Sequence, residues 1–346
     1  MKSARIIINQ CSEGGIDYGN FATKGMAEVL AAYNCALIAD MFGDAPCSQA
    51  ALVDENGSPV YLTPKMDKQE EIYTQAMQYL DDAIADLQKE DLIDPGAQDL
   101  LYQGDAEKWL KLAYGLKARY TMHLLKRSAN KDADMEKVLE YVDNSFESAE
   151  EQAAFDVYDA NNINPLYGFF VARAGLGASE SMRSKLAEYN DPRLSRAFIT
   201  KQGASGKEQA PGTADNAVYA PNGSPEQGTS KYGTSLFMYS ISAPTLLLSY
   251  HELKFLEAEA LCRLGRDAKS ALKDAVVAGL LNAESSFSVS RKELGKDLIN
   301  PAASITEAEA ESYFDNTVEA KYTAEPLKTT MTQKYFCLLY TSPSPR

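Results

Sequence analysis

Aromatic side chains that stand among asparagines and glycines are the part of the sequence best suited to binding chemistry. Those outside obvious helical patterns include Tyr158, Tyr167, Phe169, Phe170, Tyr219, Tyr232, Phe237 and Tyr239. An aromatic ring can stack on the apolar face of a sugar, while amide and carboxylate groups hydrogen-bond the sugar hydroxyls. This combination indicates carbohydrate binding. The alternative is that half or more of these rings only pack their own segment together.

Side chains that would support catalysis or metal binding are few. His123 and His251 both fall in helical patterns without a nearby Cys or second His, which favours structural or surface roles. The five cysteines are too few and too scattered for a disulfide framework or a paired zinc site, and Cys35 and Cys262 fit small buried thiols. The sequence carries no nucleophile elbow, phosphate-binding loop, zinc-protease motif or EF-hand loop. It therefore predicts no enzyme, no metal and no cofactor.

Charge and hydropathy exclude two further classes of partner. The chain has 34 Lys and Arg against 49 Asp and Glu, a formal charge of −15, whose field repels the phosphate backbone of nucleic acids. No run of about 18 apolar residues occurs, so no membrane span is expected. The apolar stretch before Cys11 is too short for a lipoprotein signal, and we expect no export signal within this sequence.

Two blocks of helices must position the aromatic segment. In the first block, about 22–148, apolar residues recur at steps of three and four, which predicts helices that begin near residues 22, 67, 106 and 132. Asp67 and Glu70 predict a helix cap with its partner acid. The only tryptophan, Trp109, lies on the apolar stripe of its helix and is expected to anchor the core.

The second block, about 249–320, begins with a helical hairpin that turns at Gly265 and Arg266. Between the blocks, about 150–248, glycines, prolines and asparagines interrupt any long helical period, apart from a short helical piece at about 179–189. Paired helices with small residues at their crossings are similar to tetratricopeptide-like units. The predicted fold is mostly α, with tetratricopeptide-like helix pairs and a loop-rich insert that carries recognition.

Short motifs also follow one another in a characteristic order. They are Asp40-Met41-Phe42-Gly43-Asp44-Ala45-Pro46 at the end of the first helix, Asp67-Lys68-Gln69-Glu70-Glu71-Ile72-Tyr73, Asp105-Ala106-Glu107-Lys108-Trp109, Asn164-Pro165, Asp191-Pro192-Arg193-Leu194, and Tyr250-His251-Glu252-Leu253 followed by Arg263-Leu264-Gly265. Their order and spacing over residues 20–336 resemble the SusD/RagB family of nutrient-binding outer-membrane lipoproteins of Bacteroidota, in its SusD-like branch.

The resemblance implies a single SusD-like domain over residues 1–336, with a SusD-like α-α superhelix. It implies a lipoprotein at the outer surface that captures oligosaccharides or peptides for a SusC-like TonB-dependent transporter, without catalysis. Its lipid anchor would precede Met1. Residues 337–346 depart from the family's late helix and are expected to be a foreign tail.

Four tyrosines are the expected ligand contacts under this interpretation, chosen by neighbourhood. They are Tyr61, Tyr167, Tyr219 and Tyr232.

Two other functions stay open at this point. One is a tetratricopeptide-like scaffold that binds a protein partner through a helical groove. The other is a glycosidase, which would need two carboxylates facing each other across a cleft. Acidic pairs such as Asp81-Asp82 and Glu70-Glu71 lie in helices rich in exposed charge, where a solvated helix face is the ordinary explanation.

Overall fold

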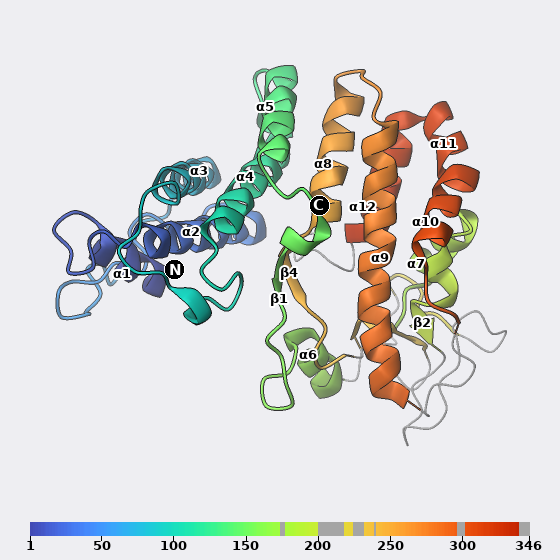
Figure 1. Ribbon diagram of the computed structural model, residues 1–346, viewed down its shortest axis with the longest axis horizontal. Coiled ribbons are helices and arrows are strands. Elements are labelled where there is room, and N and C mark those ends of the chain that lie inside the picture. Colours follow the sequence, from blue (N-terminus) through green and yellow to red (C-terminus); the bar gives the residue numbers. More distant parts are fainter. Residues whose placement is uncertain (174–176, 200–217, 224–231, 239, 296–301, 339–346) are drawn as a thin grey trace. The chain divides into compact units, whose positions relative to one another are not determined.

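The computed structural model describes residues 1–173, 177–199, 218–223, 232–238, 240–295 and 302–338 (Figure 1). The chain forms two compact units, Met1–Ala153 and Ala154–Pro345, which we call unit 1 and unit 2. Both are built mainly from helices, as the sequence predicts.

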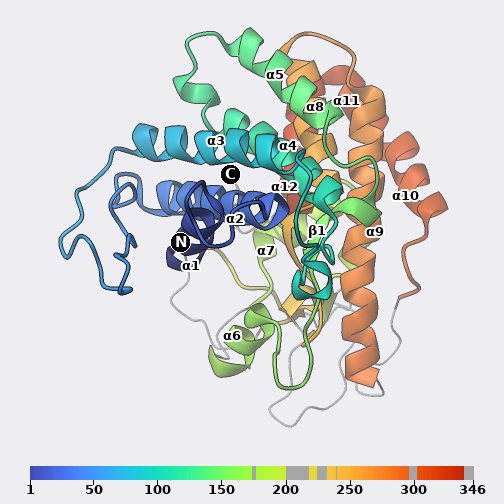
Figure 2. The ribbon, with the colours of Figure 1, turned by 60° about the vertical axis from the view of Figure 1, so that its left-hand side comes forward.

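Unit 1 is a series of helices in which each packs on the next along the chain. Its helices are α1 (Lys2–Cys11), α2 (Phe21–Phe42), α3 (Gln69–Asp86), α4 (Ala106–His123) and α5 (Lys131–Asp143), with short 3-10 turns η1 (Gly96–Gln98), η2 (Leu125–Arg127) and η3 (Ala149–Glu151). Figure 2 shows α2 and α3 lying side by side. The four predicted helices are confirmed, and α1 is an element that the sequence analysis did not predict.

Helix α2 is the centre of unit 1 because its buried side chains are small, which lets neighbouring helices approach closely. Within the described residues it is also the one helix long and apolar enough to cross a membrane. However, 56% of its most apolar stretch is buried inside the structure, and Glu28 and Asp40 interrupt that stretch. Its composition is that of a core helix in a bundle.

The predicted cap of α3 is wrong. The helix is capped at Lys68, whose backbone N–H donates to the Glu71 carboxylate at 3.0 Å. Asp67 instead accepts hydrogen bonds from the backbone N–H groups of Cys47 (2.9 Å) and Ser48 (2.6 Å) and from the Ser48 hydroxyl (2.7 Å). A carboxylate with these donors in reach satisfies the buried loop rather than the helix end.

Trp109 is a core residue, as predicted. Its side chain is 3% exposed, its ring packs edge-on against Tyr102 at 5.7 Å, and its indole N–H donates to Asp99 Oδ2 at 2.8 Å. The apolar body is buried and the one polar atom is satisfied.

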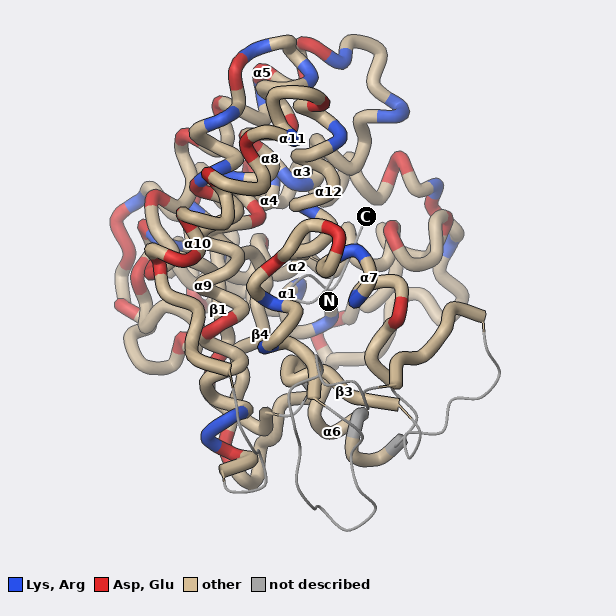
Figure 3. Tube along the Cα trace, turned by 90° about the vertical axis from the view of Figure 1, so that its right-hand side faces the viewer, with Lys and Arg blue, Asp and Glu red and all other residues tan. Residues whose placement is uncertain are grey.

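Unit 2 contains the predicted helical hairpin and three later helices. They are α8 (Tyr250–Arg263), α9 (Lys269–Leu294), α10 (Glu307–Tyr313), α11 (Glu319–Ala324) and α12 (Pro326–Leu338), with a π-helical turn η7 (Phe314–Val318) before α11. Gly265 closes α8 with a φ of +69°, a left-handed conformation that favours glycine. Acidic residues gather on α10 (Figure 3), whose charged residues are Glu307, Glu309 and Glu311. The hairpin is confirmed, and α9 runs beyond the predicted stripe.

The segment between the helical blocks contains short elements of several kinds. Its elements are α6 (Pro165–Arg173), α7 (Glu180–Glu188), the 3-10 turns η4 (Pro192–Ser195) and η5 (Leu236–Met238), and strands β1 (Ala153–Phe155), β2 (Phe198–Ile199), β3 (Thr234–Ser235) and β4 (Thr245–Leu248). Strand β1 pairs with β4, and β2 pairs antiparallel with β3. The predicted helical piece at 179–189 is α7, whereas α6 was not expected.

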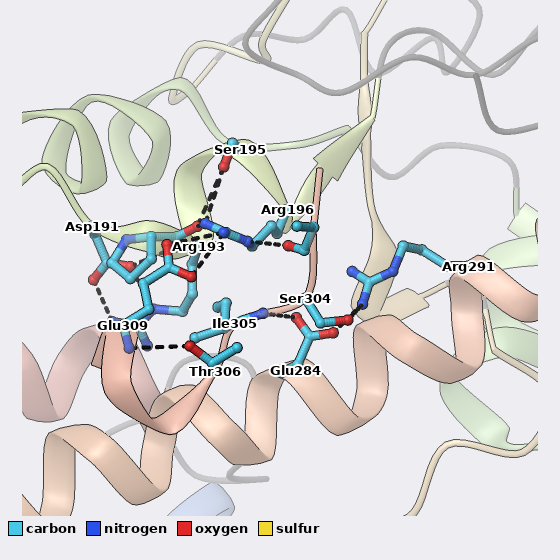
Figure 4. Close-up of polar contacts among 12 residues, drawn as sticks. Asp191, Arg193, Ser195, Arg196, Glu284, Arg291, Ser304, Ile305, Thr306 and Glu309 are labelled. Atoms are coloured by element: carbon cyan, nitrogen blue, oxygen red, sulfur yellow. Dashed lines mark hydrogen bonds and ion pairs between the residues drawn. The ribbon is translucent and has the colours of Figure 1, made fainter. Parts of the chain in front are cut away.

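Turn η4 fastens this segment to the helices of unit 2 (Figure 4). The buried Arg193 makes two hydrogen bonds to the Asp191 carboxylate, at 2.9 and 2.6 Å, and a third to Cys337 Sγ at 3.2 Å. Arg196 pairs with Glu309 of α10 at 2.9 Å. The Asp-Pro-Arg-Leu motif is therefore a structural joint.

Helix α12 runs through Cys337 and Leu338, which are both buried. These two residues were expected to begin a foreign tail, and the helix does not end before them. Residues 339–346 lie outside the described residues.

Candidate functional site

Helix α6 begins at Asn164 and Pro165, two residues with clear local roles. The Asn164 side-chain oxygen accepts hydrogen bonds from the N–H groups of Leu166 (2.7 Å) and Tyr167 (3.3 Å), which is the pattern of a helix cap. Pro165 fits the first helical position because no N–H is needed there. Asn164 thus sets where the helix starts.

The same asparagine fixes α6 to the rest of unit 2. Its backbone N–H donates to Ile241 O, and its side-chain amide donates to Ala243 O, both at 2.8 Å. Asn164 is buried, so both bonds are shielded from water. The helix is therefore held in a defined place relative to strand β4.

Helix α6 exposes several large apolar side chains. Its large exposed apolar side chains are Leu166, Phe169 and Val171, and Ile163, two residues before the helix, is exposed as well; we call these four residues the α6 surface. The Phe169 side chain is 50% exposed. Large exposed apolar side chains that include an aromatic ring are candidates for an interaction site.

Polar groups border the α6 surface on the preceding loop. Asp159 Oδ1 accepts hydrogen bonds from the backbone N–H groups of Asn161 and Asn162, each at 2.7 Å. These bonds, first from Asn162 and then from Asn161, lower the pKa of Asp159 and keep it ionised. The loop therefore offers a carboxylate and two amide side chains in the segment that leads into α6, the helix that carries Phe169. This is the combination that binds sugars, with rings for stacking and amides for hydroxyls.

The loop packs against the helix through Ile163. A side chain at Gly168 would lie 3.3 Å from the Ile163 Cδ1 atom, so the glycine leaves room for this contact. The Tyr158 hydroxyl hydrogen-bonds the Thr245 hydroxyl at 2.7 Å, which joins the loop to β4. Loop and helix form one continuous surface.

The structure places the four predicted tyrosines in different environments. Tyr167 lies on α6 and is half-buried, so it belongs to the candidate site. Tyr219 and Tyr232 lie on neighbouring backbone segments of unit 2, where Gly233 N–H donates to Val218 O at 2.8 Å. Tyr61 lies in unit 1 and is 44% exposed.

Tyr219 and Tyr232 pack into unit 2. The Tyr219 ring meets Phe198 edge-on at 5.6 Å and lies under the Arg183 guanidinium at 5.6 Å, and its burial raises its pKa. Tyr232 is 4% exposed and packs beside Gly177. Both rings have the packing role that the sequence analysis kept as an alternative for the aromatic segment.

Tyr61 belongs to a second exposed surface, in unit 1. Residues 52–66 fold back on themselves, with Val60 N–H donating to Leu52 O at 3.0 Å, and we call this segment the apolar loop. Its exposed apolar side chains are Val60, Tyr61, Leu62 and Met66, and Leu62 is 86% exposed. Except for Tyr61, these side chains are aliphatic, which suits protein contact better than sugar stacking.

The two histidines have structural surroundings. His123 Nδ1 lies 3.1 Å from Asp40 and 3.2 Å from the Tyr73 hydroxyl. His251 is buried, contacts the Ser249 hydroxyl at 3.2 Å, and has its pKa lowered to about 4 by burial, so it is neutral. Among the described residues, no group of three or more His, Cys, Asp or Glu side chains could hold a metal ion.

Phe169 was noted in the sequence as one of several aromatics, but α6 itself was missed. The signal that could have revealed it is the Asn164-Pro165 pair, a cap residue followed by a proline suited to the first helical position. The sequence of α6 is almost entirely apolar, so no alternation of polar and apolar residues marks it as an amphipathic helix.

Comparison with known proteins supports the architecture. A SusD-like family model, described as starch-binding and associating with the outer membrane, matches residues 6–342. A crystal structure of a SusD/RagB family protein from Bacteroides thetaiotaomicron is 63% identical, with a TM-score of 0.92 over 98% of this chain and 70% of that chain.

More distant solved structures share the fold. A chitin-binding protein is 23% identical, with a TM-score of 0.73, and the match covers 98% of this chain and 70% of that chain. A SusD homologue from Bacteroides fragilis is 20% identical, with a TM-score of 0.74 over 98% of this chain and 72% of that chain. No curated protein matches. The family model and the 63% identical structure place this chain in the SusD/RagB family of outer-membrane-associated binding proteins.

Proposed function

We propose that this chain binds a glycan at the α6 surface and delivers it to a SusC-like TonB-dependent transporter, without catalysis, while a lipid anchor holds it at the outer surface of the cell. The observation that carries the proposal is the exposed Phe169 ring, with Tyr167 on the same helix, which follows directly on the loop of Asp159, Asn161 and Asn162. The starch-binding description of the family supports a glycan ligand.

The charge of the chain narrows the glycan class. A net charge of −15 disfavours approach of anionic polysaccharides, because like charges repel over about 8 Å at physiological ionic strength. Neutral glucose or N-acetylglucosamine oligomers carry no such penalty. We therefore expect neutral oligosaccharides to bind in preference to uronate-containing ones and to peptides.

Calorimetric titration of the full chain with malto-oligosaccharides and chito-oligosaccharides tests the proposal. Phe169→Ala should weaken binding about 5-fold, since an aromatic contact is worth roughly 1 kcal/mol. Tyr335→Ala is the matched control, because it removes an exposed aromatic ring from α12 instead. Equal loss in both variants, or no binding of any glycan or peptide pool, would overturn the assignment of the site.

Absence of catalysis is tested separately. The full chain incubated with each bound oligosaccharide should release no reducing ends beyond the buffer control. Release that disappears when two facing carboxylates are replaced would establish the glycosidase alternative.

We also propose that the apolar loop of unit 1 contacts a protein partner, and that this partner is the transporter. The exposed aliphatic side chains of the loop, Leu62 above all, support this role. Co-purification with the transporter should fall for Leu62→Ser and stay unchanged for Phe169→Ala. Loss that maps instead to helix faces of the two blocks would favour the tetratricopeptide-like scaffold.

A further inference from the structure

Two cysteine thiols meet inside unit 1, where the chain leaves helix α2. Cys35 is in the middle of α2, and Cys47 lies 12 residues later, in the segment that leads to the apolar loop. Both side chains are buried, and their sulfur atoms are 3.1 Å apart. Two thiols at this distance need only a small further approach to reach the bonding distance of a disulfide, about 2 Å.

We propose that Cys35 and Cys47 form a disulfide in the exported protein, which covalently ties the base of the apolar loop to α2. The inference goes beyond the proposed function and does not depend on which ligand binds. It rests on the geometry of the pair and on the outer-membrane association of the family, because exported chains fold outside the reducing cytosol.

The chemistry balances through thiol–disulfide exchange with an exported protein oxidant of the dithiol/disulfide class. One thiolate of the pair attacks the oxidant's disulfide and forms a mixed disulfide, and the second thiolate then displaces the oxidant's cysteine. One S–S bond forms between Cys35 and Cys47. The two protons that the cysteines lose are taken up, directly or through solvent, by the two leaving thiolates of the oxidant, which also receives the two electrons and is reduced to a dithiol.

Surroundings of the pair favour Cys47 as the attacking sulfur. The hydrogen bond from Cys35 lowers the pKa of the Cys47 thiol against the effect of burial, and the nearby Arg5 charge acts in the same direction. The pKa of the Cys35 thiol is raised by that hydrogen bond and by burial. Cys47 also lies in a loop, whereas Cys35 lies within a helix, so local opening exposes Cys47 first.

Hydrogen bonds fix the position of the segment that carries Cys47. The Cys47 backbone N–H donates to Asp67, and the Cys47 sulfur lies 3.4 Å from the Gln75 side-chain oxygen of α3. Arg5 of α1 donates to the carbonyl oxygens of Ser48 and Ala50 in the next residues of the loop. The loop base is therefore preorganised for cross-linking rather than drawn together by it.

The other cysteines provide internal controls. The Cys262 sulfur lies 3.5 Å from the Thr330 hydroxyl, and the Cys337 sulfur accepts from Arg193, both within unit 2. A disulfide specific to Cys35 and Cys47 should therefore leave three of the five thiols free, since 5 − 2 = 3.

Thiol alkylation and peptide mapping of the full chain test the proposal directly. After equilibration with oxidised and reduced glutathione, the denatured protein should take up three alkyl groups, and mapping without reductant should recover one cross-linked peptide pair, Cys35 with Cys47. Reductant should restore uptake to five. Five accessible thiols after full oxidation, or a cross-link between any other pair, would overturn the proposal.

A thermal measurement provides the second readout. Oxidised protein should unfold several degrees above reduced protein when followed by the fluorescence of Trp109, which reports unit 1. The difference should vanish in Cys35→Ala and persist in the control variant Cys262→Ala. A difference that persists in Cys35→Ala contradicts the assignment, and the mapping of the unmutated chain remains decisive if that variant does not fold.

Discussion

The apolar loop of unit 1 and the α6 surface of unit 2 are both exposed and apolar, yet each is held in place by a different kind of buried group. The apolar loop depends on Asp67, a charged anchor that accepts from Cys47 and Ser48 and pairs with Lys65 at 3.0 Å. The α6 surface depends on Asn164, a neutral anchor that accepts three hydrogen bonds and donates two.

The difference shows that each of the two surfaces is held in place by its own buried residue. A buried carboxylate concentrates several hydrogen bonds and a charge on one residue, so its loss is costly. A buried amide spreads neutral bonds over a cap and a strand, so its loss is milder. We therefore expect that a substitution at one anchor destabilises its own surface and leaves the other surface unchanged.

The largest expected effect is the loss of the charged anchor. Asp67→Ala should lower the free energy of unfolding of unit 1 by about 3 kcal/mol, since two buried N–H groups lose their acceptor. Urea unfolding followed by Trp109 fluorescence measures this. Glu55→Ala, which removes an exposed carboxylate from the same loop, is the control, and an equal effect of both substitutions would show that Asp67 is not an anchor.

Acid should change the stability of the two units in opposite directions, lowering it in unit 2 and raising it in unit 1. Burial lowers the pKa of His251 in unit 2 from 6.5 to about 4, so its contribution to stability is present above pH 6.5 and is lost as the pH falls towards 4. The loss amounts to about 3 kcal/mol. In unit 1, burial raises the pKa of Glu28 from 4.5 to about 7, so its contribution is present below pH 4.5 and is lost as the pH rises through 7.

Parallel urea titrations at pH 7.5 and pH 5 measure both effects, with Trp109 fluorescence for unit 1 and far-ultraviolet circular dichroism for the whole chain. The acid-dependent loss in unit 2 should be abolished in His251→Gln, and the gain in unit 1 should be abolished in Glu28→Gln. Profiles that move together in both variants would mean that the units do not respond separately.

Removal of the neutral anchor should have a smaller effect, confined to unit 2. Asn164→Ala should cost about 1–2 kcal/mol and weaken glycan binding, because α6 loses its cap and its bonds to the segment before β4. Ser179→Ala is the matched control, since Ser179 caps α7 by accepting from Met182 N–H. If both substitutions weaken binding equally, the affinity does not depend on the placement of α6.

The smallest effect is expected for Leu62→Ser in the apolar loop. An exposed side chain contributes within about 0.5 kcal/mol to stability, so unfolding and glycan affinity should stay unchanged. Co-purification with the transporter should fall. A change in glycan affinity in this variant would show that the apolar loop also contributes to glycan binding.

Sequence patterns predicted the long helices because their apolar stripes are buried within one unit, as for α4 with Trp109. They missed α6, where the apolar side faces outward and no polar period appears. They misplaced Asp67, because the donors that bind it come from a segment about twenty residues earlier, which local patterns do not contain.

The candidate site was predictable in type and not in detail. Aromatics among asparagines indicated sugar binding, and Tyr167 lies on the helix that we propose as the binding site. Tyr219 and Tyr232 have similar neighbours in sequence but pack inward, because their surroundings come from distant segments such as Phe198 and Gly177. Exposure is a property of the tertiary structure, so the sequence could not rank these rings.

Helix α12 has a consequence for the order in which the chain folds. Unit 1 is built from contacts between successive helices, but Arg193 meets Cys337 across 144 residues and Glu259 meets Lys334 across 75. Local contacts form early and distant ones late, so unit 1 should reach its native structure during synthesis. Glu259 pairs with Arg263 within α8, and this ion pair can form before Lys334 of α12 is in place. Stopped-flow refolding should show Trp109 fluorescence recovering before the full helical signal, and simultaneous recovery would contradict this order.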